Sequence, residues 1–394
     1  MRKRVREERK NIFLKGENFG MKRWKCTLEE ICDIENCKLA IQKASRRKKR
    51  RKNVAQILEN IDEYARRLSE FLQQEKPEFS SGERDVINEG THKKRRELCK
   101  PVFFPDQCAH WAIMLIVSPY IERSLYTYTC ASIPGRGTHY AKRAVERYTR
   151  NTKKSKYALQ MDIKSYYASI DKEVLCTQLQ NRIKDKRVVN LLRCIIYAYD
   201  GDGLPIGYYT SAWLANFYAA PIDRLVKEKI KMPLVRYMDN LFVPDGNKRK
   251  LHLCRQAIAQ YAENYLHVRI KGDWQVYKTP YDNGRGKITI QRAIDFVGFK
   301  FYRYKTTIRK SIFKRVRKKM IALRKPTKRT VQNARSFMSY NGYLKHTDSR
   351  GVQLRYLDGY GISINKLKEI ISNEDRNQSR KHGKTGTLCV QCVA

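Results

Sequence analysis

Two aspartates stand inside apolar stretches that are otherwise typical of buried β-strands. Asp162 ends the run that begins at Leu159, and Asp239 interrupts the run from Val235 to Val243. A charge within such a strand is unfavourable unless something pairs with it. Two carboxylates from separate strands therefore predict a shared site for divalent cations. Two Mg²⁺ ions about 4 Å apart in such a site can activate an attacking hydroxyl and stabilise a leaving oxygen.

The segments around these aspartates predict a sheet flanked by helices. From residue 157 to 277, strand-like runs alternate with helical patterns, which is typical of a βαββαβ arrangement and an α+β fold class. We expect Asp171 to cap the helix that follows Asp162. Within this region the periodicity predicts helices over 172–199, 210–230 (bent at Pro221) and 248–265.

The flanking regions give further predicted elements. On the N-terminal side we expect a helix pair over 27–44, one amphipathic helix over 54–72 and a β-hairpin within 78–105. A helix over 106–118 follows, which is capped by Asp106 and ended or kinked by Pro119. The last predicted helix on this side covers 140–150 and is preceded by the glycine-rich loop 132–139. On the C-terminal side they are helices over 307–325, 330–342 and 362–371. Large aromatic residues within these elements are expected in the core, namely Tyr166, Trp213, Phe217, Phe296 and Phe299.

The charge of the chain points to a polyanionic partner. The 394 residues contain 83 Lys and Arg against 39 Asp and Glu, a net charge of +44. Basic surface of this kind neutralises phosphates and releases their counterions. The run from Arg46 to Lys52 is expected to grip phosphates, and residues 1–24 to be mobile until such a partner binds. A membrane role would need an apolar span or an amphipathic anchor, and neither is found.

The eleven cysteines follow no disulfide-framework pattern. Without a signal peptide they predict reduced thiols and a cytoplasmic protein. Cys389 and Cys392 form a lone C-x-x-C, which supplies half a zinc site at best. We expect that segment to be a disordered tail rather than a metal site.

The motifs together resemble prokaryotic reverse transcriptases, most closely those of diversity-generating retroelements and the unclassified or antiviral-defence group. The similarity runs from about Thr27 to Ser372. It is carried by motifs in the order found in that family: Pro105–His110, Gly135–His139, Met161–Tyr167, Gly203–Ser211, Arg236–Asn240, Phe296–Phe299 and Ser339–His346.

The resemblance implies a right-hand polymerase with fingers, a ferredoxin-like palm and a helical thumb. Its expected organisation is a basic helical N-terminal extension at 1–75, fingers at 76–160, palm at 161–300 (with part of the fingers at 172–205), thumb at 301–372 and a disordered tail at 373–394.

The resemblance also implies roles for individual residues. Asp162, Asp239 and Asn240 would be catalytic, with Asp162, Asp239 and the carbonyl of Ile163 holding Mg²⁺ or Mn²⁺. Nucleotide binding would fall to Lys94, Arg95, Arg96, Ile163, Tyr167, Ile206, Gly207, Thr210 and Lys271. Among these, Tyr167 would exclude a 2′-hydroxyl and Lys271 is a candidate general acid for pyrophosphate. The primer grip would be Phe296, Val297, Gly298 and Phe299.

The implied activity is RNA-directed DNA synthesis from dNTPs on a structured non-coding RNA, in antiviral defence or a retroelement. A protein partner subunit or a homo-oligomer is possible, and a membrane is not expected. Asn240 stands where the family usually has a second Asp, and an amide offers no charge to a metal. Ile206 fits the diversity-generating and antiviral-defence group that the chain resembles, whereas Ala212 stands where diversity-generating enzymes usually have Gln. Two alternatives stay open: a weakened or inactive RNA-binding scaffold, and an untemplated or protein-primed DNA polymerase.

Overall fold

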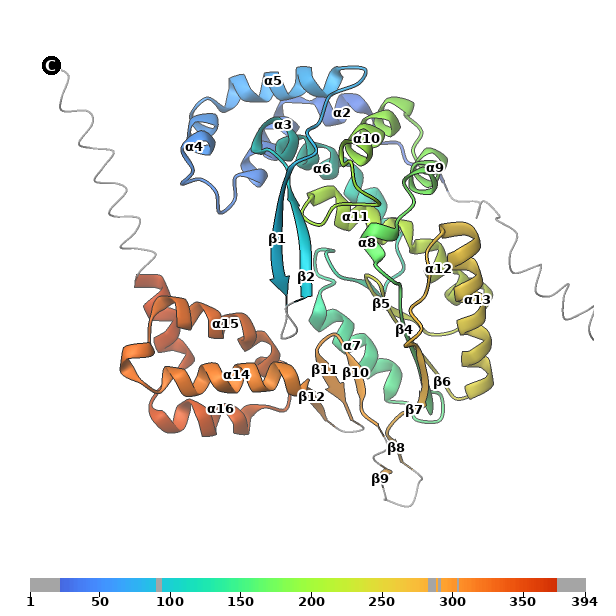
Figure 1. Cartoon of the computed structure of the whole chain (residues 1–394), viewed down its shortest axis with the longest axis vertical. Helices are drawn as coiled ribbons and strands as arrows, with labels where there is room; N and C mark the ends of the chain where they lie inside the picture. Colours follow the sequence, from blue (N-terminus) through green and yellow to red (C-terminus); the bar gives the residue numbers. More distant parts are fainter. Residues whose placement is uncertain (1–21, 90–93, 283–287, 290–291, 303–304, 374–394) are drawn as a thin grey trace, which may run out of the picture. The chain divides into compact units, whose positions relative to one another are not determined.

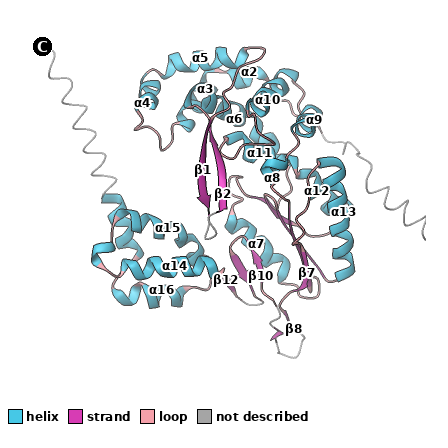
Figure 2. Cartoon of the chain, viewed as in Figure 1, coloured by secondary structure: helices cyan, strands magenta, loops and turns pink. Residues whose placement is uncertain are grey.

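The computed structural model describes residues 22–89, 94–282, 288–289, 292–302 and 305–373. The chain divides into two compact units, Met1–Tyr277 and Lys278–Ala394. Helices predominate, and strands form small sheets and hairpins among them (Figure 2), so the predicted α+β class is confirmed. Most of residues 1–24 and the tail that carries Cys389 and Cys392 lie outside the described ranges. Trp24, however, is buried, and its N–H donates to the carbonyl of Arg182, so the expectation of mobility is wrong for this residue.

A five-stranded sheet forms the centre of the first unit, in the order β3-β5-β6-β4-β7 (Figure 1). Its strands are β3 (Thr129–Cys130), β4 (Tyr157–Asp162), β5 (Val235–Tyr237), β6 (Asn240–Asp245) and β7 (Gln275–Lys278). β6 pairs antiparallel with both β4 and β5, whereas β3 and β5 are parallel. Because β4 and β6 lie inside the sheet, their apolar residues are buried and their register is strongly specified.

Helices cover this sheet and fill the rest of the first unit. α13 (Lys248–Leu266) contacts β4 and β6, and α7 (Thr138–Thr149) contacts β3 and β5. The remaining helices are α2 (Leu28–Cys32), α3 (Ile34–Ala44), α4 (Lys52–Glu59), α5 (Ile61–Gln73), α6 (Cys108–Ser124), α8 (Tyr166–Ser169), α9 (Lys172–Arg182), α10 (Lys186–Ala198), α11 (Tyr209–Tyr218) and α12 (Ala220–Arg224), with π-helical turns η1 (Phe103–Gln107) and η2 (Leu225–Lys229). The predicted hairpin is present as β1 (Glu83–Glu89) and β2 (Lys94–Lys100).

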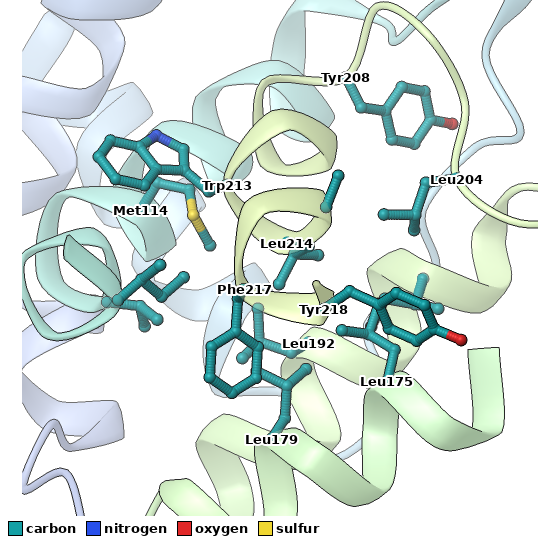
Figure 3. Close-up of a cluster of buried hydrophobic side chains, with 14 of the residues drawn as sticks. Met114, Leu175, Leu179, Leu192, Leu204, Tyr208, Trp213, Leu214, Phe217 and Tyr218 are labelled. Carbon is teal, nitrogen blue, oxygen red and sulfur yellow. The ribbon is translucent and has the colours of Figure 1, made fainter. Parts of the chain in front are cut away.

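Helix α11 lies within the apolar core of the first unit (Figure 3). Its buried face carries Trp213, Leu214 and Phe217, which pack among side chains from α6, α9 and α10. Phe217 also lies 5.2 Å from Trp24, measured between ring centroids. Trp213 and Phe217 were expected in the core, and their burial confirms it. The core fixes the start of α11, which follows the loop next to the candidate site.

Several predicted helices are interrupted, which corrects the sequence interpretation. The helix expected over 172–199 is two helices, because Ile183 forms a bridge with Trp24 and Asp185 caps the next helix. The helices expected over 54–72 and 210–230 are likewise divided, near Asn60 and Ala219. Asp106 is buried and accepts hydrogen bonds from Ser80 instead of capping a helix. Pro119 lies within α6, which continues to Ser124.

The second unit has its own core. Strands β10 (Ile294–Phe296), β11 (Phe299–Phe301) and β12 (Thr306–Ile308) form an antiparallel sheet, and β8 (Tyr281–Asp282) pairs with β9 (Ile288–Thr289). Helices α14 (Lys310–Leu323), α15 (Val331–Lys345) and α16 (Arg350–Tyr356) follow, with 3-10 turns η3 (Pro326–Lys328) and η4 (Asp358–Tyr360) and a helix over 364–373. α16 was not predicted. Within the described ranges of both units, no helix is long and apolar enough to cross a membrane.

Candidate active site

The structure brings Asp162 and Asp239 to one edge of the central sheet. Asp162 is the last residue of β4 and pairs with Asn240, the first residue of β6. Asp239 precedes Asn240 in the two-residue turn that joins β5 and β6. The backbone N–H of Ile163 donates to the carbonyl of Asp239 at 3.1 Å. The two aspartates predicted to share a site are therefore joined through the backbone of Ile163.

Lys271 reaches this site from the segment after α13. Ile270 forms an antiparallel bridge with Ile163, and the N–H of Lys271 donates to the carbonyl of Asp162 at 2.8 Å. The Lys271 ammonium lies 3.2 Å from Oδ2 of Asp162. The pairing of these two segments thus places a cation beside the carboxylate. Sequence spacing alone gave no contact between residues 162 and 271.

The environment of Asp162 disfavours its ionised form. Burial raises the pKa of Asp162, and the charge of Asp239 raises it further, while the ammonium of Lys271 partly offsets both effects. The side chain of Asp162 is still 30 % exposed. Two carboxylates held together and facing one cation leave an excess of negative charge. A divalent cation would relieve that excess.

Asn240 contacts Asp239 directly. Its amide Nδ2 donates to Oδ1 of Asp239 at 3.1 Å. A carboxylate in the same place could not donate this hydrogen bond. The amide therefore orients Asp239 without adding a second charge to the turn.

Tyr167 lies beside the carboxylates, in the short helix α8 that follows β4. Ser165 adopts a left-handed conformation, with φ 49°, and turns the chain sharply between Asp162 and this helix. The Tyr167 hydroxyl lies 3.8 Å from Sδ of Met238, next to Asp239. Burial raises the pKa of Tyr167 to about 12, the charge of Asp239 raises it as well, and the guanidinium of Arg96 lowers it. The charges of Asp239 and Arg96 thus both act on the Tyr167 hydroxyl.

The loop over 203–207 links α8 to the hairpin. The N–H of Leu204 donates to the carbonyl of Tyr167, and the carbonyl of Ile206 accepts from the N–H of Cys99 in β2, both at 2.8 Å. Gly203 and Gly207 have φ values of +64° and +125°. A Cβ on Gly203 would overlap the carbonyl of Tyr167, and one on Gly207 the carbonyl of Cys99. Both glycines are therefore needed for this close approach.

The other predicted nucleotide-binding residues are distributed as follows. Arg95 and Arg96 belong to β2, with Arg95 exposed and Arg96 half-buried, and Lys94 begins that strand with a side chain outside the described set. Thr210 is buried in the first turn of α11. The predicted primer-grip residues form the turn between β10 and β11 in the second unit, where Phe296 and Phe299 are buried.

A buried ion pair behind the β5–β6 turn was not predicted. Arg236 in β5 and Asp223 in α12 are 0 % and 1 % exposed, and Nε of Arg236 lies 2.7 Å from Oδ1 of Asp223. Arg236 also donates to the carbonyl of Met238 at 3.0 Å, inside the turn that carries Asp239. The sequence contained a signal for Arg236, because a charge in an apolar strand needs a partner. It contained none that identified Asp223 as that partner.

The donor set at the turn suits a hard divalent cation. Asp162 and Asp239 offer carboxylate oxygens, and Ile163 offers a backbone carbonyl, which are ligands that Mg²⁺ and Mn²⁺ accept. Across the described part of the chain, no group of three or more His, Cys, Asp and Glu could hold a metal. Mg²⁺ prefers octahedral coordination and keeps several waters, so a cation held by these groups would take its remaining oxygens from water or from a ligand such as a triphosphate.

Part of the chain matches a known protein family. Residues 112–273 match the model described as "Reverse transcriptase (RNA-dependent DNA polymerase)". The match includes Asp162, Asp239 and Lys271, and it agrees with the resemblance expected from the motifs. It covers less than half of the chain, and its ends do not reach the hairpin or the second unit.

Two curated relatives and several solved structures are similar to the chain. It is 27% identical over 171 residues to an "Uncharacterized 91 kDa protein in cob intron" of Schizosaccharomyces pombe, covering 41% of this chain and 20% of that protein. It is 31% identical over 109 residues to "Retron Ec73 reverse transcriptase" of Escherichia coli, covering 24% of this chain and 34% of that enzyme. The chain thus spans about a third or less of the length of these relatives.

Among solved structures, telomerases of Candida albicans and Candida tropicalis in complex with a telomeric RNA fragment share 12% and 10% identity with the chain. Their TM-scores are 0.43 and 0.44, and the alignments cover 77% and 78% of this chain and 62% and 55% of theirs.

Proposed function

We propose that this protein is an RNA-directed DNA polymerase that adds deoxynucleotides to a primer by attack of the primer hydroxyl on an α-phosphate. The observation that carries the proposal is the meeting of Asp162 and Asp239 at one sheet edge, within the segment that matches the reverse transcriptase family. Such a transfer needs positioned reactants and charge stabilisation.

Asp162, Asp239 and the carbonyl of Ile163 would hold the divalent cations. When bound, the cations would lower the pKa of the primer hydroxyl and neutralise the leaving pyrophosphate. The raised pKa of Asp162 supports this assignment, because two carboxylates facing one ammonium gain from further positive charge. Asn240 would keep Asp239 oriented through its amide hydrogen bond.

The protein's own groups would place the nucleotide around this site. Arg95 and Arg96, with Lys94, would contact the triphosphate, since guanidinium and ammonium groups bind phosphate oxygens. Tyr167, a largely buried neutral phenol next to Asp239, would pack under the sugar and exclude a 2′-hydroxyl. Lys271, held beside Asp162, would supply a proton to the departing pyrophosphate.

Ile206, Gly207 and Thr210 would border the pocket for the template base and nucleotide. The close approach of Gly207 to the β2 backbone supports this, because it brings the loop against the strand that carries Arg95 and Arg96. The turn over Phe296–Phe299 would grip the primer. The predicted fingers, palm and thumb boundaries are part of the same proposal.

The template would be a structured non-coding RNA, and the biological setting antiviral defence or a retroelement. The net charge of +44 supports a nucleic-acid partner, and the relative named as a retron enzyme supports the setting. Sequencing the nucleic acid that co-purifies with the protein tests both. A single recurrent RNA with complementary DNA is expected, whereas DNA unrelated to any bound RNA would point to untemplated or protein-primed synthesis.

Incorporation of labelled dNTPs on a primed RNA, with Mg²⁺ or Mn²⁺, tests the activity. We expect incorporation by the native protein and its loss in Asp162→Ala and Asp239→Ala. Glu59→Ala, which removes an exposed carboxylate at the end of α4, is the matched control and should leave the rate unchanged.

The second candidate function is an RNA-binding scaffold without catalysis, which Asn240 favours because it leaves the turn with one carboxylate. Tight, salt-sensitive RNA binding with no incorporation by the native protein would establish that alternative and overturn the polymerase proposal.

A further inference from the structure

We propose that Arg236, with its buried partner Asp223, is a positioning residue that holds the Asp239 carboxylate in the geometry needed for metal binding. The inference rests on the proposed function and extends it. Arg236 lies behind the turn and does not contact Asp162 or Asp239 in any described hydrogen bond. Its effect on the site would pass through the backbone of Met238.

Every N–H donor of the Arg236 guanidinium has an acceptor. Its Nε and one Nη2 proton are donated to the two Asp223 carboxylate oxygens, at 2.7 and 2.8 Å. The other Nη2 proton is donated to the carbonyl of Asn216 at 3.0 Å. Nη1 donates to the Met238 carbonyl at 3.0 Å and to Oδ1 of Asn216 at 3.4 Å. All five donors of the guanidinium thus have acceptors, on three different elements.

These contacts fix the turn from behind. The N–H of Met238 donates to the carbonyl of Cys130, and its carbonyl accepts from Arg236, so both backbone polar groups of this residue are held. Met238 has φ +56°, a conformation that residues other than glycine adopt at a cost. Asp239 follows directly. The Arg236 contact is therefore a side-chain brace on a strained residue beside the carboxylate.

Stability alone does not explain why a fully buried ion pair is used here. Removing two charges from water is costly, and well-packed apolar residues in place of a buried pair are often neutral or stabilising. An apolar pair could fill the space between β5 and α12, but it could not donate to the Met238 carbonyl. Arg236 makes that donation as well as those to Asn216, and the donation to Met238 is the one that acts on the turn. Asn240 is an amide, so Asp239 supplies the one carboxylate at this turn. The orientation of the Asp239 carboxylate therefore matters more for metal binding.

The test is the double substitution Arg236→Met with Asp223→Leu in the full chain, which removes both charges together. We expect a folded protein with unchanged RNA affinity and a lower melting temperature, because the Thr129 hydroxyl and the carbonyls of Asn216 and Met238 lose their buried partners. We also expect kcat for single-nucleotide addition to fall by about 100-fold, the scale produced by a shift of about 1 Å in reacting groups. Excess Mn²⁺ should restore part of the rate, because a higher concentration of the cation would fill a site whose affinity has fallen. Ser69→Ala removes a buried hydrogen bond to the carbonyl of Cys32, far from the turn. It is the control that shows what a loss of stability alone does to kcat.

A second readout does not depend on activity. Fe²⁺ placed at the site generates hydroxyl radicals that cut nearby backbone, so cleavage near residues 162 and 239 reports metal binding directly. We expect strong cleavage in the native protein and at least about fivefold weaker cleavage in the double variant, which corresponds to about 1 kcal/mol. Native cleavage without dNTP incorporation would end the proposed polymerase function while leaving the positioning role measurable.

Native kcat and native cleavage in a folded double variant would overturn the positioning role. If the double variant does not fold, Arg236→Lys takes its place. That variant keeps the charge opposite Asp223 but cannot reproduce the planar fork, and the same losses of kcat and cleavage are expected. Unchanged values in a folded Arg236→Lys protein would likewise overturn the proposal.

Discussion

Asp162 combines two opposing demands, because the charge that would bind a cation is costly while no cation is bound. Its pKa is raised by burial and by Asp239, with partial relief from Lys271. A carboxyl with a raised pKa in the folded state stabilises the fold when protonated. That contribution is lost as pH rises through the folded-state pKa. At neutral pH, the ionised Asp162 therefore lowers the stability of the metal-free protein.

Asp162→Asn tests this trade-off between stability and function. In the absence of divalent cations at neutral pH, we expect a small rise in melting temperature, measured by differential scanning fluorimetry. The difference should shrink on acidification below the pKa of Asp162, where the native carboxyl is protonated too. Addition of Mn²⁺ should stabilise the native protein and not the variant. A lower melting temperature for the metal-free variant at neutral pH would contradict the assigned cost.

Asn240→Asp asks what the amide contributes to the turn. The change replaces the donor that bonds to Asp239 with a second negative charge about 3 Å away. We expect the metal-free protein to lose about 1–4 kcal/mol of stability, the range for like charges at such a distance near a surface. The Mg²⁺-dependent gain in melting temperature should become larger, and less Mg²⁺ should be needed for half-maximal activity. Equal stabilisation by Mg²⁺ in both proteins would show that residue 240 does not face the cation.

At this scale, sequence reasoning identified charges in apolar strands but not their partners. Asp162 and Asp239 were predicted because a charge within an apolar strand is unfavourable unless something pairs with it. Arg236 carried the same signal, yet its partner Asp223 looked like an ordinary polar position in a helix. The pairing depends on how α12 crosses behind β5. Such packing is a tertiary property that strand and helix periodicity do not contain.

At the scale of elements, the loop over 203–207 joins the hairpin to the short helix α8 that follows Asp162. Its backbone bonds to Tyr167 on one side and to Cys99 in β2 on the other. The resemblance assigned Ile206 and Gly207 of this loop to nucleotide binding. The contact with β2 could not be predicted, because it joins residues about 100 positions apart through backbone groups alone.

Gly207→Ala tests whether the contact between this loop and β2 contributes to nucleotide binding. The φ of +125° and the overlap with the Cys99 carbonyl leave no room for a Cβ. We expect a loss of roughly 2–3 kcal/mol in unfolding free energy and a higher KM for dNTPs, because the loop must move away from β2. Gly137→Ala is the control, since its Cβ would have nothing within 4 Å. An unchanged KM in Gly207→Ala, with the expected stability loss, would place nucleotide binding elsewhere.

The division of predicted helices has a related cause. Residues 172–199 are apolar at helical spacing throughout, so periodicity favoured one helix. The break at Ile183 arises because Trp24, far away in sequence, pairs with it, and Asp185 then caps α10. Local pattern sets the type of element, whereas contacts from distant residues set where it ends.

At the scale of the whole molecule, the net charge of +44 predicts a steep salt dependence of RNA binding. Logarithmic affinity falls with logarithmic salt by about 0.7 per phosphate contact for single strands. The α7 row is formed by two exposed arginines of α7, Arg143 and Arg147, and by its C-cap residue, Arg150. Arg143 lies over the ring of Tyr140, and Arg147 donates to the Tyr128 hydroxyl. Cations interleaved with aromatic rings suit single-stranded nucleic acid.

Replacing the three arginines of the α7 row with Gln should make the salt slope shallower by about 2. Fluorescence anisotropy with a labelled single-stranded RNA at several salt concentrations gives the slope. The control is replacement of Lys248, Arg249 and Lys250 at the start of α13, which removes the same charge from other exposed positions. Equal changes in the two variants would mean that overall charge, and not the α7 row, sets the affinity.

The division of the chain into two units has a consequence for the proposed function. The carboxylates, Tyr167, Lys271, the loop and the hairpin all belong to Met1–Tyr277, whereas the turn predicted to grip the primer belongs to Lys278–Ala394. Each unit has its own apolar core, so a substitution in one core leaves the other intact. Under the proposed function, a core substitution after residue 277 should therefore change how long the primer stays bound and leave the rate of each single addition unchanged.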